Sequence, residues 1–180
     1  MKNKQKVFQL VIIGVAAAII CVLGPLSIPI GVVPVAFANL AIYIVLYVLG
    51  MKKGTVSVLI YLLVGLIGVP VFSNFSGGPG KLLGPTGGYL IGYIFMALIS
   101  GYIIDRFFEN QVLCFLGMVL GTSVLYVFGT AWLTYQADMS AGAALAAGVI
   151  PFIPGDLAKI LIATIVGSQI RKRLIRANLF

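Results

Sequence analysis

Residues 151–167 read PFIPGDLAKILIATIVG, a stretch that combines the apolar pattern of a membrane helix with two charges. Asp156 and Lys159 lie three residues apart at its head, in a chain with only four acidic residues. In one interpretation, Asp156 suits the dipole of a first helical turn and Lys159 neutralises it locally. In the other, which we favour, the pair faces inward and binds a polar ligand. A charge toward lipid costs about 2.5–3.5 kcal/mol at a helix centre, and a paired charge in a cavity avoids that cost.

The composition indicates an integral membrane protein. The 180 residues are 61% hydrophobic and 9% charged, whereas soluble domains carry about 25% charged residues. Six apolar runs are long enough to cross a bilayer, and they leave no room for a soluble domain. We therefore expect one all-α, multi-pass domain over residues 1–180 in the cell membrane, with spans at about 7–24, 33–50, 54–71, 87–105, 111–134 and 154–171.

The positions of the basic residues predict how the spans are oriented. Positive charges gather in cytoplasmic connections, and with six spans nearly all of them fall on one side. We therefore expect both termini in the cytoplasm. The net charge of +8 then reflects the orientation of the chain in the lipid bilayer rather than binding to nucleic acid. The residues concerned are Lys2, Lys4, Lys6, Lys52, Lys53, Arg106, Arg171, Lys172, Arg173 and Arg176.

The composition speaks against an enzyme. The chain has no histidine, its four acids are scattered, and Cys21 and Cys114 lie singly in apolar runs. We therefore expect no catalytic residue, no metal site and no cofactor.

The stretch GGPGKLLG (77–84) resembles a phosphate loop, but Phe75 and Leu82 stand where that pattern needs Gly and Ser or Thr. Energy for active transport would have to come from a partner or an ion gradient.

The connections on the outer side predict a binding site there. Residues 24–33, 71–88 and 134–155 are rich in Gly and Pro and still carry apolar side chains, as is typical of loops that fold over something. Asn74 and Thr86 would offer hydrogen bonds to a ligand there. Phe72, Tyr89 and Trp132 would form its walls, although anchoring at the membrane interface is the common alternative for an aromatic residue.

Four pairs of small residues at i, i+4 predict close helix packing in lipid. Each pair serves either packing within the chain or docking of a partner. The pairs are Gly14/Ala18, Gly88/Gly92, Gly117/Gly121 and Ala163/Gly167.

Several motifs together resemble one family. Their order and spacing, which cover nearly the whole chain, are similar to the BioY family, the biotin-binding S-components of energy-coupling-factor (ECF) vitamin transporters. The stretches are Gly68-Val-Pro-Val-Phe72, Gly84-Pro-Thr-Gly-Gly-Tyr89, Gly129-Thr-Ala-Trp-Leu133 and Pro151-Phe-Ile-Pro-Gly-Asp-Leu-Ala-Lys159.

The resemblance implies that biotin is captured at the outer face and delivered inward. Asp156 and Lys159 match the family's Pro-Gly-Asp-x-x-Lys motif and would contact biotin, with Tyr89 and Asn74 in the matching tyrosine and loop segments. We expect Asp156 to accept a ureido N–H, with Lys159 holding it and donating to the ring carbonyl. The reverse orientation, with Lys159 on the biotin carboxylate, is open. An S-component or stand-alone carrier for a different vitamin is the alternative function.

The resemblance also implies partners. S-components dock on a membrane-embedded coupling subunit with two ATP-binding cassette ATPases, through small residues on the first helix. Gly14 and Ala18 match that docking pattern, and Ala17 with Cys21 offers a rival register.

Overall fold

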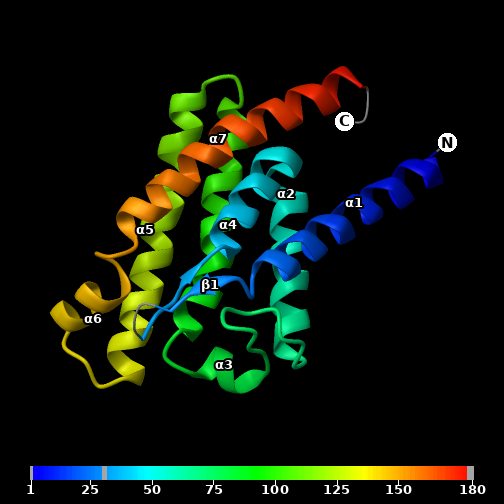
Figure 1. Cartoon of the computed structure of the whole chain (residues 1–180). Helices are drawn as coiled ribbons and strands as arrows, with labels where there is room; N and C mark the ends of the chain where they lie inside the picture. Colours follow the sequence, from blue (N-terminus) through cyan, green and yellow to red (C-terminus); the bar gives the residue numbers. More distant parts are fainter. Residues whose placement is uncertain (1, 30–31, 178–180) are drawn as a thin grey trace.

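The computed structural model describes residues 2–29 and 32–177, with side chains from residue 5 onward. The side chains of Lys2 and Lys4, two of the predicted basic residues, therefore lie outside the described part of the chain. Residues 30 and 31 of the predicted connection 24–33 lie outside it entirely. Helices dominate (Figure 1). The elements are α1 (Lys2–Leu23), β1 (Ser27–Ile28), β2 (Val35–Ala36), α2 (Ala38–Leu66), α3 (Pro79–Leu83), α4 (Gly87–Phe107), α5 (Gln111–Gln136), α6 (Ala141–Gly148) and α7 (Ile153–Arg176).

Five helices are long and apolar enough to cross a membrane: α1, α2, α4, α5 and α7. The predicted all-helical membrane architecture is thus confirmed at this level. Four of the predicted spans correspond to single helices, and the spans predicted at 33–50 and 54–71 both fall largely within α2. The first of these spans was predicted to start too early and the second to end too late. Residues 35–36 form β2 after Pro34, and α2 ends at Leu66, shortly before Gly68, whose φ of 104° does not suit a helix.

Helix α2 reverses direction at Gly50. This residue has φ 76° and ψ −177°, so the helical hydrogen bonding is interrupted there. A Cβ added at Gly54 would lie 3.3 Å from the Cα of Leu46, whereas eight residues of a continuous helix extend about 12 Å. The two halves of α2 are therefore antiparallel, as Figure 1 shows (cyan and teal).

Asp105 on α4 ties the reversal to two other helices. Its carboxylate accepts the backbone N–H of Met51 at 2.8 Å and two guanidinium N–H groups of Arg171 on α7 at 3.1 Å each. Arg171 also donates to the carbonyl of Tyr47 at 3.2 Å. A side chain at Gly50 would collide with the Asp105 carboxylate. Glycine is thus required both by its positive φ and by this contact.

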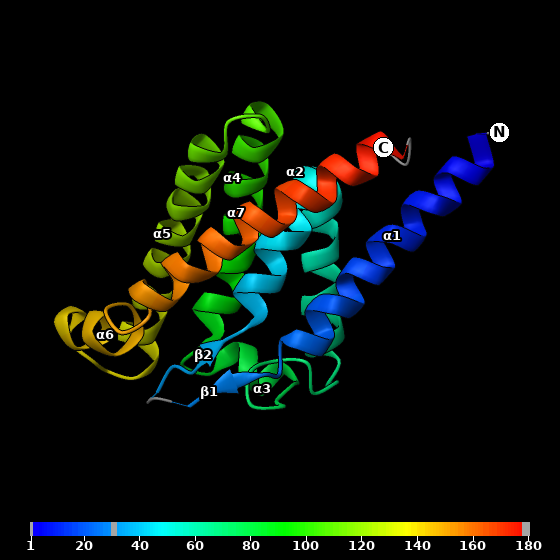
Figure 2. The ribbon, with the colours of Figure 1, turned by 45° about the horizontal axis from the view of Figure 1, so that its top comes forward.

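The two ends of the molecule differ in structure. The short elements gather at one end, where β1 pairs with β2 (Ser27 opposite Ala36), while both termini lie at the opposite end (Figure 1). Helix α7 runs obliquely across α5 and α2, and α1 lies obliquely beside α2 at the edge of the molecule (Figure 2). The short elements β1, α3 and α6 lie within connections that were predicted as loops, whereas β2 replaces the start of the span predicted at 33–50. Local signals start two of them: Pro79 opens α3, and Ser140 caps α6 by accepting the N–H of Ala143 at 3.3 Å.

Small residues bring the helices close together, as predicted. At the α4–α5 interface, a Cβ at Gly88 would strike Trp132 and a Cβ at Gly121 would strike Ser100. Gly167 on α7 lies against Tyr47 in the same way. Gly14 on α1 differs, because nothing lies within 4 Å of its Cβ position. Three of the four predicted pairs therefore serve packing within the chain.

Replacing Gly50 by alanine should destabilise the fold. The positive φ and the loss of space at Asp105 should together cost about 1–3 kcal/mol of unfolding free energy. Thermal unfolding in detergent checks this. Gly14→Ala is the matched control and should leave stability unchanged or slightly raised. Equal midpoints for the two variants would show that the reversal does not need glycine.

Candidate functional site

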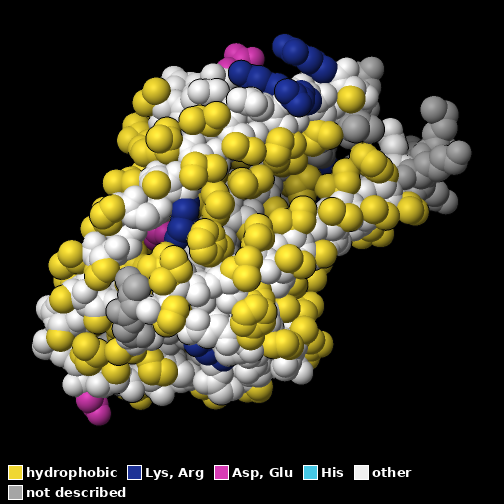
Figure 3. Space-filling view, viewed as in Figure 1, with side chains coloured by type: hydrophobic (Ala, Val, Ile, Leu, Met, Phe, Trp, Pro, Cys, Tyr) yellow, Lys and Arg dark blue, Asp and Glu magenta, His cyan; other side chains and the backbone are white. Residues whose placement is uncertain are grey.

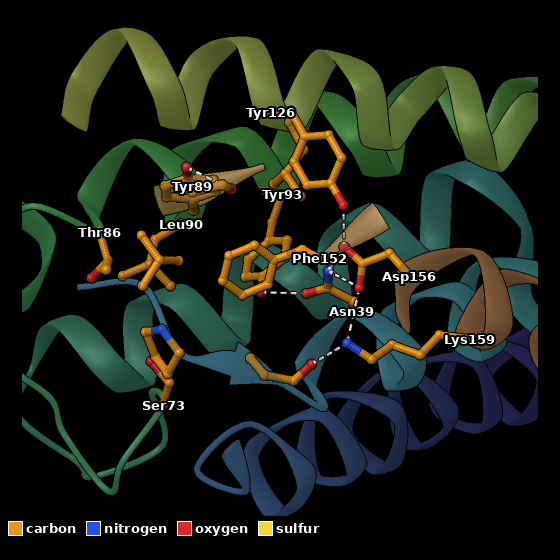
Figure 4. Close-up of a pocket in the computed structure, with 15 residues that line it drawn as sticks. Asn39, Ser73, Thr86, Tyr89, Leu90, Tyr93, Tyr126, Phe152, Asp156 and Lys159 are labelled. Carbon is orange, nitrogen blue, oxygen red and sulfur yellow. Dashed lines mark hydrogen bonds and ion pairs between the residues drawn. The ribbon is translucent and has the colours of Figure 1, made fainter. Parts of the chain in front are cut away.

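Helices α2, α4, α5 and α7 enclose a small cavity at the end where the short elements gather. Its volume is about 50 Å³, and Val33 and Pro34 before β2 and Ser73 after α2 also line it. Apolar walls come from Leu90, Leu125 and Phe152. Figure 4 shows the polar side chains that converge on it from the surrounding helices. They are Asn39, Thr86, Tyr89, Tyr93, Tyr126, Asp156 and Lys159.

The Asp156 carboxylate is the centre of this site. Only 3% of the residue is exposed, and three side chains from three helices donate to it. Lys159 Nζ lies 2.9 Å from Oδ1, the Tyr126 hydroxyl lies 2.6 Å from Oδ2, and Asn39 Nδ2 lies 3.4 Å and 3.3 Å from the two oxygens. A buried carboxylate is tolerated only when such donors replace water. The site therefore surrounds the Asp156 carboxylate with donors in place of water.

Lys159 is held between α7 and the end of β2. Its ammonium donates to Asp156 and to the backbone carbonyl of Ala36, both at 2.9 Å. An ammonium has three N–H donors, so within the described part of the chain one donor is left for a ligand oxygen. The ion pair has the predicted i, i+3 spacing, and both side chains are buried rather than turned toward lipid.

Tyr93 on α4 fixes the orientation of Asn39. Its hydroxyl donates to Asn39 Oδ1 at 2.6 Å, which turns the Asn39 amide N–H toward Asp156. Both residues are buried. Asn39 has two roles, because its hydrogen bond to Tyr93 joins α2 to α4 and its side chain also lines the cavity.

Four of the predicted site residues line the cavity together: Asp156, Lys159, Tyr89 and Thr86. Tyr89 donates its hydroxyl to the carbonyl of Gly148 at 3.0 Å, so it joins α4 to the end of α6. Thr86 immediately precedes α4. These positions place one predicted wall residue and one predicted polar residue beside the ion pair.

The other three predicted contacts lie outside the lining and hold the surrounding loops. Asn74 exchanges hydrogen bonds with Ser27 at 2.8 Å and 2.9 Å, joining its loop to β1. Phe72 is fully buried against Gly65 and packs edge-on against Tyr61, with ring centroids 5.5 Å apart. Trp132 donates to the carbonyl of Gly84 at 2.9 Å. The Asn74 side-chain oxygen, the Phe72 ring and the Trp132 indole N–H are thus engaged within the chain.

Sequence reasoning missed Tyr126, Phe152, Leu90 and Ser73 as lining residues. A usable signal existed only for Tyr126. It stands four residues after Thr122 inside an apolar span, so the two polar side chains share one helix face.

Residues 2–29 and 32–177 contain no cluster of three or more His, Cys, Asp or Glu side chains that could hold a metal ion.

Comparison with known proteins places the chain in a family. The sequence profile of the BioY family matches residues 1–176. The chain belongs to the BioY family. The predicted resemblance is confirmed, and as a BioY protein the chain is a transporter subunit rather than an enzyme.

Individual BioY relatives are similar over nearly their whole length. The biotin transporter BioY2 of Lactococcus lactis is 35% identical over 99% of this chain and 97% of its own. The biotin transporter BioY of Thermotoga maritima is 35% identical over 91% and 96%. A crystal structure of the S-component for biotin from an ECF-type ABC transporter superposes with a TM-score of 0.88 at 33% identity, covering 96% of this chain and 95% of that one.

Removing the Tyr93 hydroxyl should weaken the framework of the site. Tyr93→Phe leaves the buried Asn39 carbonyl without a donor, which should cost about 1–3 kcal/mol of stability. Thermal unfolding in detergent measures this cost. Tyr102→Phe on the same helix is the control, because Tyr102 is exposed. If both variants unfold like the parent protein, the Tyr93–Asn39 bond does not support the site.

Proposed function

We propose that this BioY chain binds biotin in the cavity around Asp156 and delivers it across the cell membrane as the substrate-specific subunit of an ECF-type transporter. The observation that carries the proposal is the buried Asp156–Lys159 pair facing a cavity between helices. The similar proteins of known name are biotin transporters, and the similar solved structure is an S-component for biotin.

The chemistry of biotin suits the groups in the cavity. Its ureido ring carries two N–H donors and a carbonyl, and its bicycle and valeryl chain are apolar. Asp156 accepts a ureido N–H, and the remaining donor of Lys159 binds the ring carbonyl. Phe152 and Leu90 pack against the apolar parts, with Tyr89 and Thr86 at the wall. Asn74, Phe72 and Trp132 act indirectly, by holding the loops that cover the ligand.

The proposed topology is six crossings with both termini in the cytoplasm. The reversal of α2 at Gly50 gives the second and third crossings, and both termini lie opposite the loop-rich end. Lys and Arg side chains gather at the end where the termini lie (Figure 3), as the positive-inside rule requires of a cytoplasmic end. The binding cavity then opens to the outside.

Gly14 and Ala18 form the proposed docking surface for the membrane-embedded coupling subunit, which works with two ATPases. Both residues are exposed on α1, one turn apart, and no atom lies within 4 Å of the Gly14 Cβ position. Ala17 is 3% exposed and packs inward. The structure therefore favours the Gly14/Ala18 register over the Ala17/Cys21 register.

Asp156→Asn should abolish tight biotin binding while the protein stays folded. The amide cannot carry the charge that attracts the ureido N–H, and it leaves Lys159 without its ion-pair partner. We expect at least a hundredfold loss of affinity, measured by titration of the purified protein with labelled biotin. Asp138→Asn, in the connection after α5, is the control and should bind as the parent does. If the loss in Asp156→Asn merely follows the unfolded fraction, the pair is structural.

Enlarging the docking residues should separate binding from transport. Gly14→Leu and Ala18→Leu keep the partner's helix at a distance, so uptake by the assembled transporter should fall at least tenfold while biotin binding to the isolated chain is retained. Val22→Leu, on an exposed part of the same helix, is the control. Normal uptake by both docking variants would refute this surface.

A further inference from the structure

A second cavity lies directly behind the Asp156 carboxylate. It has a volume of about 320 Å³ and lies between α5 and α7. Ile153, Leu157 and Ile160 supply its apolar side, while Thr122 and Ser123 supply hydroxyl groups. Ser123, Ile153 and Leu157 are exposed, so the mouth of this cavity faces the lipid side of the helix pair. None of the proposed ligand contacts other than Asp156 lines it.

The two cavities are divided by a thin partition. Tyr126 and Asp156 are the two residues that line both cavities. Their side chains meet in the 2.6 Å hydrogen bond from the Tyr126 hydroxyl to Asp156 Oδ2, which Figure 4 shows beside the outer cavity. Breaking this bond and moving one aromatic ring would join the two spaces.

The outer cavity is too small for its proposed ligand in this conformation. Its volume is about 50 Å³, whereas small-molecule pockets usually measure roughly 300–1,000 Å³. The ligand therefore needs space that a side chain must vacate. The α5–α7 cavity of about 320 Å³, which Tyr126 also lines, is large enough to receive a displaced ring.

Among the three donors to Asp156, Tyr126 is the one that can leave. Asn39 is held by Tyr93, and Lys159 is held by the Ala36 carbonyl. The hydroxyl of Tyr126 has no second hydrogen bond within the described part of the chain, and its ring is only partly buried. The Ser123 hydroxyl lies one turn earlier on α5 and donates to the Val119 carbonyl, so its oxygen is open to accept the phenol.

We propose that Tyr126 is a movable partition whose displacement admits the ligand. A ligand N–H takes the place of the phenol on Asp156 Oδ2, and the ring swings into the α5–α7 cavity. The displaced hydroxyl then donates to Ser123. This inference rests on the proposed function, since the ligand that displaces the phenol is biotin. Tyr126 thereby sets both the available volume and the rate of ligand entry.

Filling the α5–α7 cavity tests the swing without touching the ligand contacts. Leu157→Trp adds an indole at a 40% exposed position that lines only this cavity. With the space occupied, Tyr126 cannot move, and biotin affinity should fall at least tenfold. Leu161→Trp, at a 53% exposed position on the same helix outside the cavity lining, is the matched control and should bind within twofold of the parent.

Tyr126→Phe tests the hydrogen bond separately and keeps the ring. Without the hydroxyl that competes for Oδ2, biotin should associate several-fold faster and bind several-fold more tightly, a gain that a merely structural role would not give. Weaker binding by Tyr126→Phe would show that the phenol is a fixed ligand contact and would overturn the proposal. Unchanged affinity in folded Leu157→Trp would overturn it as well. A parent protein that fails to bind biotin would contradict the proposed function instead.

Discussion

The buried carboxylate of Asp156 constrains the half of this protein that carries the short elements. An ionised group inside a membrane-spanning helix is costly unless neighbouring groups replace its water. Here the replacement comes from three helices: Asn39 on α2, Tyr126 on α5 and Lys159 on α7 itself. These donors meet where α2, α5 and α7 converge near the short elements. The site and the arrangement of the helices are therefore consequences of one electrostatic requirement.

The two ends of the bundle handle charge in different ways. At the end that carries the termini, Asp105 and Arg171 join α4 and α7 to the reversal of α2, and Gly50 gives them room. At the other end, the acid lies beside a cavity under short elements and loops. The ion pair holds the helices together at the first end, while short elements and loops at the second end are easier to displace. This difference suits a protein that must open for its ligand at one face while its helices stay in register. The α5–α7 cavity extends that adjustable region behind the ligand site.

The long helices and the central acid of the site could be predicted from the sequence because lipid imposes simple rules. Long apolar runs located the helices, and the scarcity of acids singled out Asp156. The short elements β1, β2, α3 and α6 could not be predicted, because they are too short to leave a periodic pattern. Tyr126 was missed because a tyrosine in an apolar span is typical of interface anchoring. Asn74 and Trp132 were predicted as ligand contacts, but the Asn74 side-chain oxygen and the Trp132 indole N–H form hydrogen bonds within the loops, where backbone groups also need partners.

Equilibrium binding of labelled biotin to the purified chain in detergent, with no other subunit present, tests the central claim most directly. Riboflavin and thiamine serve as competitors. The account predicts saturable, tight binding that unlabelled biotin displaces and the other two vitamins do not. A folded, monodisperse sample that binds no biotin, or that releases it equally to either competitor, would contradict the assignment of the Asp156 cavity to biotin.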